Sequence, residues 1–334
     1  TIENGKTLTN NGTIENNGTL TTNGTLTTNG TFKGKLGVNQ PLNIGGNEGF
    51  DVTCTYGEVT FNYEKEKKQL TIDETRSSEV LIKGRKKDHA VECGIVIAQD
   101  ADIVLTIEDL NIEAGEALVY NRTSDGSKWA YNLFLHGANR LTSTSGPGIN
   151  YNENTVFFYG SGSLTVTGGD GAVGIQADAL GIYENAFVVA IGGKGATSGI
   201  DINKSLDLDS CLLIQGSLQS DGTILQTSSE LVGNSFTLGV DAEIPAWATV
   251  TIAADQTFTI ENGKTLTNNG TIENNGSLTN SGTLTNNGSI YNKGTFTGNP
   301  VGGKLYHYIT FNANYPVSPD VDERYILQGG ALPT

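Results

Sequence analysis

Four aspartates are the residues whose type and spacing first suggest chemistry. Asp207 and Asp209 alternate with leucines, so both carboxylates should project outward from one strand. Asp178 and Asp201 occupy comparable places on adjacent turns of the chain. Because calcium is bound by several carboxylate and carbonyl oxygens, two turns that contribute such residues could hold one ion. The four residues are therefore predicted as a calcium site, with four solvated carboxylates as the alternative.

Calcium beside a basic residue would suit a polysaccharide lyase, in which Arg or Lys removes the proton α to a uronate carboxylate. The basic candidates in this part of the chain are Arg122, Arg140, Lys194 and Lys204. None of them lies in a recognisable lyase motif. We therefore assign no catalytic residue and favour a protein that is not an enzyme, with calcium-dependent lyase activity as the lesser alternative.

Exposed aromatic rings are the second chemical signal, because the C–H faces of sugar rings stack on them. Trp129 lies in a polar stretch, Ser124-Asp-Gly-Ser-Lys-Trp129, where a role in the core is not expected. Other aromatic residues crowd the same region. The predicted carbohydrate-binding residues are Tyr120, Trp129, Tyr131, Tyr151 and Tyr159. Three phenylalanines, Phe157, Phe158 and Phe187, are expected to fill the interior instead.

Composition limits the partners. The chain has 334 residues, of which 20 are basic and 36 acidic, and its net charge of −16 disfavours nucleic acid, since phosphate binding needs a basic face. No apolar run approaches the ~20 residues of a membrane helix, so no membrane insertion is expected. Cys54, Cys93 and Cys211 are too few and too scattered for a disulfide framework, and we expect buried thiols. The absence of Met indicates a processed or excised piece.

The ends of the chain consist of a six-residue repeat with the pattern Thr, aliphatic, any, Asn or Thr, Asn, Gly. It runs from Thr1 to Gly34 and returns from Thr259 to Gly298. Each unit predicts a three-residue strand with its aliphatic side chain on one face, followed by an Asn-Asn-Gly turn. Three units would close a coil of about 18 residues in a narrow β-solenoid, with aliphatic columns inside and asparagine ladders at the corners. Disorder and an ice-binding array of Thr-x-Thr pairs are the alternatives.

In the middle of the chain the repeat is longer. Pairs of a small and an aliphatic residue open successive strands at intervals of 23, 31, 26 and 25 residues. These pairs are Gly94-Ile95, Ala117-Leu118, Gly148-Ile149, Gly174-Ile175 and Gly199-Ile200. Short alternating segments lie between them, and helical periodicity is not sustained. The pattern predicts an all-β fold, namely a right-handed parallel β-helix with coils of about 25 residues.

Four regions follow from these changes of pattern: N-terminal hexapeptide repeats over 1–48, the central β-helix over 49–240, C-terminal hexapeptide repeats over 241–301, and a linker or small β-module over 302–334. The segment 49–91 leads into the central part, and its many basic residues are expected to form a solvated face that blunts the open sheet edge. The lead-in to the second array, 244–257, implies that a similar segment preceded Thr1.

The middle segment covers about half of the chain, and two groups of residues in it carry a resemblance to a known family. They are Gly94-Ile-Val-Ile97 with Ile103-Val-Leu-Thr-Ile-Glu-Asp-Leu-Asn-Ile112, and the later cycle Gly162-Ser-Leu-Thr-Val-Thr167, Gly174-Ile175, Gly199-Ile200 and Leu206-Asp-Leu208. In these residues the segment resembles a family of bacterial cell-surface, carbohydrate-binding parallel β-helix proteins that are related in fold to pectate lyases. The flanking hexapeptides are similar to spacer repeats of large surface adhesins.

The resemblance implies a secreted or wall-attached protein that binds plant or host polysaccharide, with calcium as the candidate cofactor. We therefore predict an extracellular protein of the cell surface or cell wall whose non-catalytic β-helix binds polysaccharide and contributes to adhesion. It is expected to be a monomer within a larger surface protein. The runner-up is a purely structural adhesin stalk or spacer, because the near-identical terminal arrays carry almost no chemistry.

Overall fold

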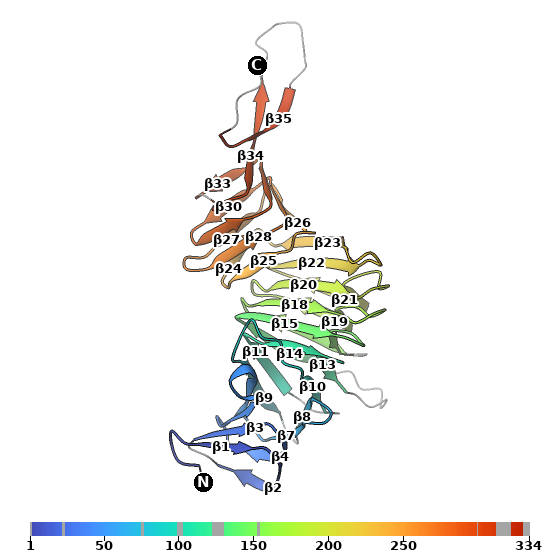
Figure 1. Ribbon diagram of the computed structural model, residues 1–334. Coiled ribbons are helices and arrows are strands. Elements are labelled where there is room, and N and C mark those ends of the chain that lie inside the picture. Colours follow the sequence, from blue (N-terminus) through green and yellow to red (C-terminus); the bar gives the residue numbers. More distant parts are fainter. Residues whose placement is uncertain are drawn as a thin grey trace, which may run out of the picture.

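The computed structural model describes residues 2–21, 24–74, 77–98, 103–121, 130–151, 154–298, 300–311 and 322–329. Apart from one 3-10 turn at Gly46–Glu48, the elements in these ranges are β-strands. The molecule is elongated, with the N-terminal strands at one end and the C-terminal strands at the other (Figure 1). None of the described elements is a helix that is long and apolar enough to cross a membrane. The fold is therefore all-β, as predicted, and most of its strands lie in parallel sheets.

The N-terminal repeats form short strands that pair in parallel with the strand 18 residues later, which is the length of three units. Thr7, for example, lies opposite Thr25. Within the third strand Leu26 is buried and Thr25 and Thr27 are partly exposed, because successive side chains of a strand point to opposite faces. The strands are β1 (Thr7–Asn10), β2 (Thr13–Leu20), β3 (Thr25–Thr28), β4 (Thr31–Leu36) and β5 (Pro41–Ile44).

The next four strands pair in a way that the sequence did not indicate. β4 pairs with β7, β5 with β6, β6 with β9 and β7 with β8, all antiparallel. These pairings join the N-terminal repeats to the central strands in one 17-stranded sheet. Hydrogen bonding between strands therefore continues across residue 48, the predicted end of the N-terminal region. The strands are β6 (Phe50–Tyr56), β7 (Val59–Glu64), β8 (Gln69–Glu74) and β9 (Ser78–Gly84).

In the centre, strands of successive turns stack in parallel and in register. The residues that open these strands form one column, in which Leu70, Ile95, Leu118, Ile149, Ile175 and Ile200 lie next to one another in that order. The predicted small-aliphatic pairs therefore mark equivalent positions. The strands of this column are β8, β10 (Gly94–Ile97), β13 (Leu118–Tyr120), β16 (Ile149–Asn150), β19 (Ile175–Ile182) and β21 (Ile200–Leu208).

Two further columns complete each turn. One consists of β9, β11 (Ile103–Glu108), β14 (Ala130–His136) and β17 (Thr155–Tyr159), and continues into the second halves of β19 and β21. The other is a separate sheet whose parallel strands are β12 (Asn111–Ala114), β15 (Ala138–Ser143), β18 (Ser163–Thr167), β20 (Phe187–Gly192) and β22 (Cys211–Leu218). The second sheet ends in the antiparallel strand β23 (Ile224–Val232).

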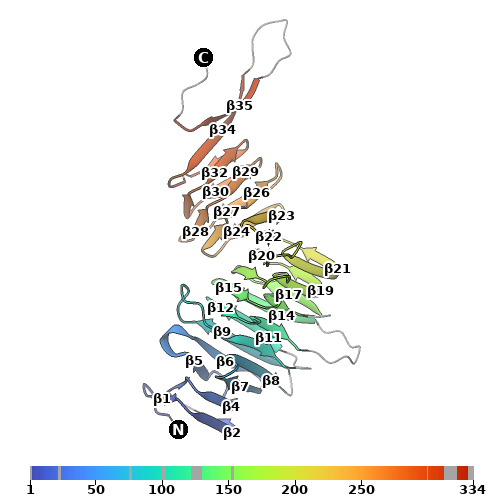
Figure 2. The same ribbon diagram turned by 45° about the vertical axis from the view of Figure 1, so that its right-hand side comes forward.

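Two hydrophobic cores share β20 and β22 as a common wall. Almost every side chain of both strands is buried, which explains why their sequences are continuous apolar runs instead of alternating ones. Val188 and Leu213 face the central core, whereas Phe187 and Leu212 face the second core. Phe187 is therefore buried, but in a core that was not predicted. The second core places the C-terminal strands beside the outer face of β20 and β22 (Figure 2).

The C-terminal repeats form three small parallel sheets around the second core. Inside them, buried asparagines form the predicted ladders: Asn268 Nδ2 donates to Asn286 Oδ1 at 2.8 Å, and Asn274 Nδ2 to Asn292 Oδ1 at 2.6 Å. The strands are β24 (Ser235–Leu238), β25 (Ala242–Ile244), β26 (Thr249–Ile252), β27 (Thr257–Ile260), β28 (Thr265–Asn268), β29 (Thr271–Asn274), β30 (Ser277–Asn280), β31 (Thr283–Asn286), β32 (Ser289–Asn292) and β33 (Thr295–Thr297).

The chain then forms an antiparallel hairpin, β34 (Lys304–Phe311) and β35 (Asp322–Leu327), whose first strand pairs with β32. The three cysteines, Cys54, Cys93 and Cys211, are buried thiols, as expected, and none of the three forms a disulfide. Burial raises the pKa of Cys93 and of Cys211 to about 12, so both thiols stay protonated near neutral pH.

Candidate functional site

Three of the five predicted sugar-binding aromatic residues lie in the core. Tyr120 and Tyr151 are 1% and 0% exposed, and Tyr131 is 5% exposed. Their rings pack against one another, with centroids 4.2 Å apart for Tyr120 and Tyr151 and 4.6 Å apart for Tyr120 and Tyr131. The expectation that these rings are exposed is wrong, because strand alternation points them inward. Burial also raises the pKa of Tyr120 and of Tyr151. Trp129 lies outside the described residues.

The fifth predicted residue, Tyr159, belongs to a row of rings on the outer face of β14, β17 and β19. Phe134 lies opposite Tyr159 in the sheet, and Tyr183, directly after β19, continues the column. The ring centroids of Phe134 and Tyr159 are 5.4 Å apart and those of Tyr159 and Tyr183 are 5.3 Å apart. Phe157 lies beside the column, 6.3 Å from Tyr159 and 6.1 Å from Tyr183. We call these four rings the aromatic strip.

The alternation of side chains between the two faces of each strand explains why the aromatic strip faces outward. The neighbouring side chains of Leu133, Phe158 and Ile182 are fully buried, whereas the four rings of the strip are partly exposed. The prediction that Phe158 fills the interior is confirmed, and the same prediction for Phe157 is wrong. The interplanar angles of 22° and 26° within the column are those of stacked rings. Their centroid distances exceed the ~3.5–4.0 Å of direct carbon contact, so the rings are displaced from a face-to-face sandwich.

Gly181 makes room for two rings of the strip. A Cβ atom at this position would lie 2.5 Å from Tyr183 Cε2 and 2.6 Å from Phe157 Cδ1, so any side chain would displace both rings. The Tyr183 hydroxyl donates a hydrogen bond of 2.7 Å to Asp207 Oδ2. Burial, followed by this hydrogen bond and the charge of Asp207, raises the pKa of Tyr183 to about 12. The strip is thus held in place by packing and by one charge-assisted hydrogen bond.

Polar side chains border the aromatic strip on several sides. Asp207 lies opposite Gly181, and Asp209 lies next to Leu208, which is the partner of Ile182. Both aspartates are exposed. At the other end Thr106 lies opposite Phe134, and Asn132 lies opposite Phe157. The outer face therefore combines an aromatic centre with carboxylate, hydroxyl and amide groups at its margins, which is the mixture that a polyhydroxylated ligand can use.

The structure does not bring the four predicted calcium ligands together. Asp178 is buried and its Oδ2 is 2.6 Å from Lys204 Nζ, so a cation already neutralises it. Asp207 accepts from Tyr183, and Asp209 Oδ1 accepts from Ser210 Oγ at 3.1 Å. Asp201 is exposed elsewhere on β21. Within the described part of the chain, no cluster of three or more His, Cys, Asp or Glu side chains could hold a metal ion.

The basic candidates for lyase chemistry are also dispersed. Lys204 is paired with Asp178, Arg140 lies on β15 in the other sheet, and Lys194 is exposed between β20 and β21. Arg122 falls outside the described residues. The ammonium group of Lys204 is thus occupied by Asp178 and not by the aspartates at the end of the aromatic strip.

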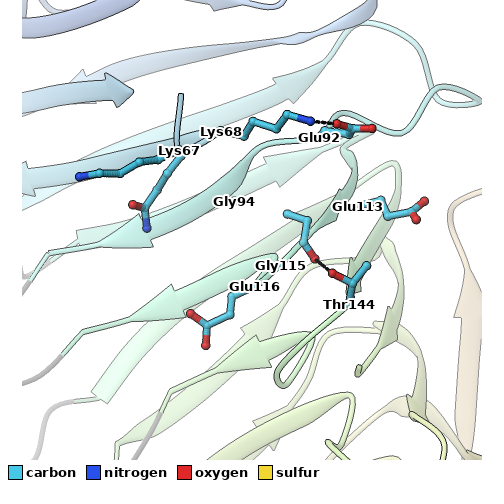
Figure 3. Close-up of a pocket in the computed structure, with 10 residues that line it drawn as sticks. Lys67, Lys68, Glu92, Gly94, Glu113, Gly115, Glu116 and Thr144 are labelled. Carbon is cyan, nitrogen blue, oxygen red and sulfur yellow. Dashed lines mark hydrogen bonds and ion pairs between the residues drawn. The ribbon is translucent and has the colours of Figure 1, made fainter. Parts of the chain in front are cut away.

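A pocket of about 390 Å³ lies between the loops that precede β10 and follow β12. Its charged lining residues have both signs, and an ion pair joins Lys68 to Glu92. Figure 3 shows that the side chains of Glu113 and Glu116 point apart. The two carboxylates therefore do not face a common point, as an acid and base acting on one substrate atom would.

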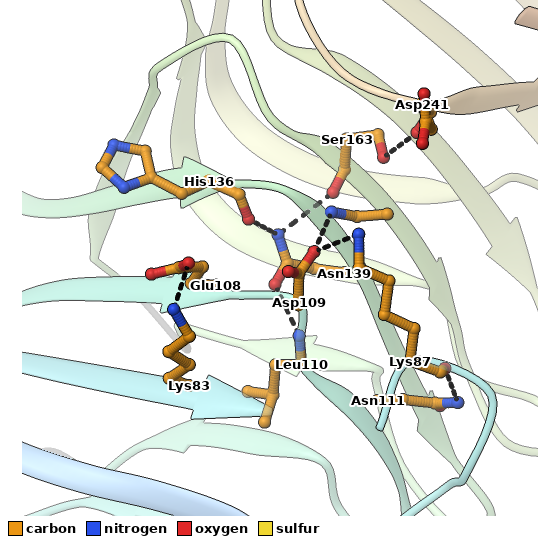
Figure 4. A network of polar contacts seen from close by, with 11 residues as sticks. Lys83, Lys87, Glu108, Asp109, Leu110, Asn111, His136, Asn139, Ser163 and Asp241 are labelled. Carbon is orange, nitrogen blue, oxygen red and sulfur yellow. Dashed lines mark hydrogen bonds and ion pairs between the residues drawn. The ribbon is translucent and has the colours of Figure 1, made fainter. Parts of the chain in front are cut away.

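A second polar cluster forms the corner that joins two sheets (Figure 4). Asp109 has a φ of 51°, and its Oδ1 accepts from Ala138 N at 3.0 Å and from Lys87 Nζ at 2.9 Å. The buried Asn139 donates to the carbonyl oxygens of His136 and Ser163 and accepts from Leu110 N. Because these groups satisfy one another, the cluster is a structural corner.

Phe134, Phe157 and Tyr183 are partly exposed aromatic residues that were not predicted from the sequence. The available signal was alternation: Phe134 stands between Leu133 and Leu135, so it must face away from the side that the leucines occupy. Stacking the turns in register would then have placed Tyr159 next to it. Which of the two faces is solvent-exposed could not be decided from one strand alone.

Comparison with protein-family models, with curated proteins and with solved structures finds no match for this chain. The resemblance to carbohydrate-binding β-helix proteins, and that of the hexapeptides to adhesin spacers, thus remain predictions.

Proposed function

We propose that the stacked turns form a right-handed parallel β-helix and that the hexapeptide arrays are narrow solenoids of the same kind. The in-register parallel columns, which repeat at about 25 residues in the centre and 18 residues at the ends, support the proposal. The right hand follows from the strong preference of parallel strand connections for a right-handed crossover.

We further propose that the chain is a rod-shaped module of an extracellular surface protein and that it binds polysaccharide along the aromatic strip. The observation that carries this proposal is the row of partly exposed rings, Phe134, Tyr159 and Tyr183, on three successive turns of one outer face. A soluble protein that leaves such rings exposed in a contiguous row has a surface suited to a ligand. Localisation at the cell surface or wall, adhesion, and a monomeric state within a larger protein belong to the same proposal.

The geometry of the strip favours a linear polysaccharide. Strands stack about 4.8 Å apart, so the row extends along the rod and a chain lying on it would contact several rings in succession. The displaced stacking leaves part of each ring face available to sugar C–H groups. At the end of the row, Asp207 and Asp209 can accept hydrogen bonds from hydroxyl groups, and the negative charge there disfavours polyuronates.

A panel of immobilised neutral and acidic polysaccharides tests this function with wild type and Tyr159→Ser. Removal of the central ring should weaken binding about tenfold, since an aromatic contact contributes roughly 0.5–1.5 kcal/mol beyond its buried area. Tyr291→Ser is the matched control, because Tyr291 is also a partly exposed, stacked tyrosine, 4.8 Å from Tyr306, but lies in the C-terminal array. Equal losses in the two variants, or wild type that binds no polysaccharide, would contradict the proposal.

A structural stalk or spacer is the second candidate function. It is favoured by the near-identity of residues 1–20 and 259–278, which differ only at Thr19 and Ser277, and by the buried asparagine ladders that stiffen the C-terminal copy. A spacer requires no ligand. The polysaccharide panel therefore separates the two candidates, because a wild-type protein that binds nothing on it would be assigned to the spacer.

A further inference from the structure

A groove of about 640 Å³ separates the second central sheet from the C-terminal array. One wall is the outer face of β12, β15 and β18, with Asn111, Arg140 and Thr165, and the other carries Asp241, Glu243 and Thr267. The groove is distinct from the aromatic strip, which lies on the outer face of the other sheet. Its volume falls within the roughly 300–1,000 Å³ of typical ligand sites, and junctions between two folded units are common places for them.

The groove exists because the second core covers only part of the central sheet. The outer side chains of β20 and β22 are apolar and lie under the C-terminal array, whereas Arg140 and Thr165, on β15 and β18, are polar and remain uncovered. Two hydrogen bonds fix the walls to each other. Ser163 Oγ is 3.4 Å from the carbonyl oxygen of Asp241, a contact drawn in Figure 4, and Thr237 N donates to Asn185 Oδ1 at 2.8 Å.

Several polar groups in the groove have unused hydrogen-bonding capacity. The Asn111 amide donates to the carbonyl oxygen of Lys87, and its Oδ1, which has no partner among the described residues, is buried and therefore not open to a ligand. The Arg140 side chain is exposed, and within the same ranges it forms neither an ion pair nor a hydrogen bond. Asp241 and Glu243 each accept one hydrogen bond, from Thr265 N and Asn269 Nδ2, and retain a further oxygen. The groove thus offers the Arg140 guanidinium as a donor on one wall and carboxylate acceptors on the other.

We propose that this groove binds a neutral oligosaccharide. Hydroxyl groups both donate and accept, so one sugar can accept from Arg140 and donate to the free carboxylate oxygens of Asp241 and Glu243. Lys87 is already paired with Asp109, which leaves Arg140 against Asp88, Asp241 and Glu243, and this excess of negative charge disfavours an acidic glycan. The groove contains no aromatic residue among its lining residues, so recognition here depends on hydrogen bonds and not on stacking.

Calorimetric titration with maltohexaose, cellohexaose and mannohexaose tests the groove in a Tyr159→Ser background, in which binding to the aromatic strip is weakened. At least one of these neutral hexasaccharides should still bind, and tetragalacturonate should not. Adding Thr165→Trp, which fills the groove, should weaken that binding at least tenfold. Thr142→Trp is the control, because Thr142 is equally exposed on the outer face of β15 but does not line the groove. Arg140→Ala should weaken binding without adding bulk.

These variants test the groove proposal and the aromatic-strip proposal separately. Loss of all hexasaccharide binding in Tyr159→Ser would overturn the groove proposal and leave the strip intact. Equal affinities of the Thr165→Trp and Thr142→Trp variants would also overturn it. Binding that is unchanged by Tyr159→Ser and lost with Thr165→Trp would establish the groove while contradicting the strip. Circular dichroism of each variant verifies that its strands are retained.

Discussion

At the scale of single residues, the direction of each side chain decides its role. Tyr151 and Tyr159 are both aromatic, close in sequence and predicted for the same task, yet one is buried and the other partly exposed. Sequence indicates that an aromatic residue lies in a strand, but its direction depends on the register of that strand against its neighbours. One predicted residue, Tyr159, therefore lies on the strip, whereas Tyr120, Tyr131 and Tyr151 form an internal stack.

Tyr183 should make stability depend on alkaline pH. Its pKa is raised to about 12, against roughly 10 in the unfolded chain, so between these values the native state holds a proton that the unfolded state has lost. The stabilisation is fully present below pH ~10 and is lost as pH rises through about 12. Denaturant unfolding of wild type and Tyr183→Phe from pH 9 to 12 measures this, and the variant should show the shallower decline. Identical slopes would show that Tyr183 titrates like a free tyrosine.

At the scale of elements, the strands were predictable and part of their pairing was not. The hexapeptide and the small-aliphatic pairs each repeat, so their parallel stacking follows from the period. Residues 50–84 contain no repeat, and their four strands pair antiparallel with one another and with β4 and β5, while β8 and β9 also pair in parallel with β10 and β11. Nothing local to a strand specifies its partner. In the same way, the apolar runs of β20 and β22 indicated burial but not that two separate cores would use them.

The asparagine ladder should stabilise the C-terminal array. Asn286 is fully buried, accepts from Asn268 and donates to the carbonyl oxygen of Lys304, so Asn286→Ala should lower the free energy of unfolding by about 1–3 kcal/mol. Asn287 is the control. It makes the same kind of amide contact, to Asn269 at 2.8 Å, but is exposed, and Asn287→Ala should change stability by less than ~0.5 kcal/mol. Denaturant titration compares the two variants, and equal losses would contradict a ladder that acts through burial.

At the scale of the whole molecule, the two hydrophobic cores meet at β20 and β22, and this arrangement shapes the surfaces that we assign to ligands. The aromatic strip lies on β14, β17 and β19 of the first central sheet, whereas the groove is lined by β12, β15 and β18 of the second, so the two surfaces belong to different sheets. Composition predicted neither surface. Composition does show the acidic net charge. Exposed aspartates on β21 contribute to this charge beside the aromatic strip, which is one of the two candidate ligand surfaces.

Hydroxyl-radical footprinting with the most strongly bound polysaccharide of the panel tests the central claim most directly, because it reports the exposure of individual aromatic side chains. Bound polysaccharide should slow the oxidation of Phe134, Tyr159 and Tyr183 while Tyr291, on the C-terminal array, reacts at an unchanged rate. Protection at Tyr291 with none along the strip, or unchanged rates at all four rings despite binding, would contradict the assignment of the strip as the polysaccharide-binding surface.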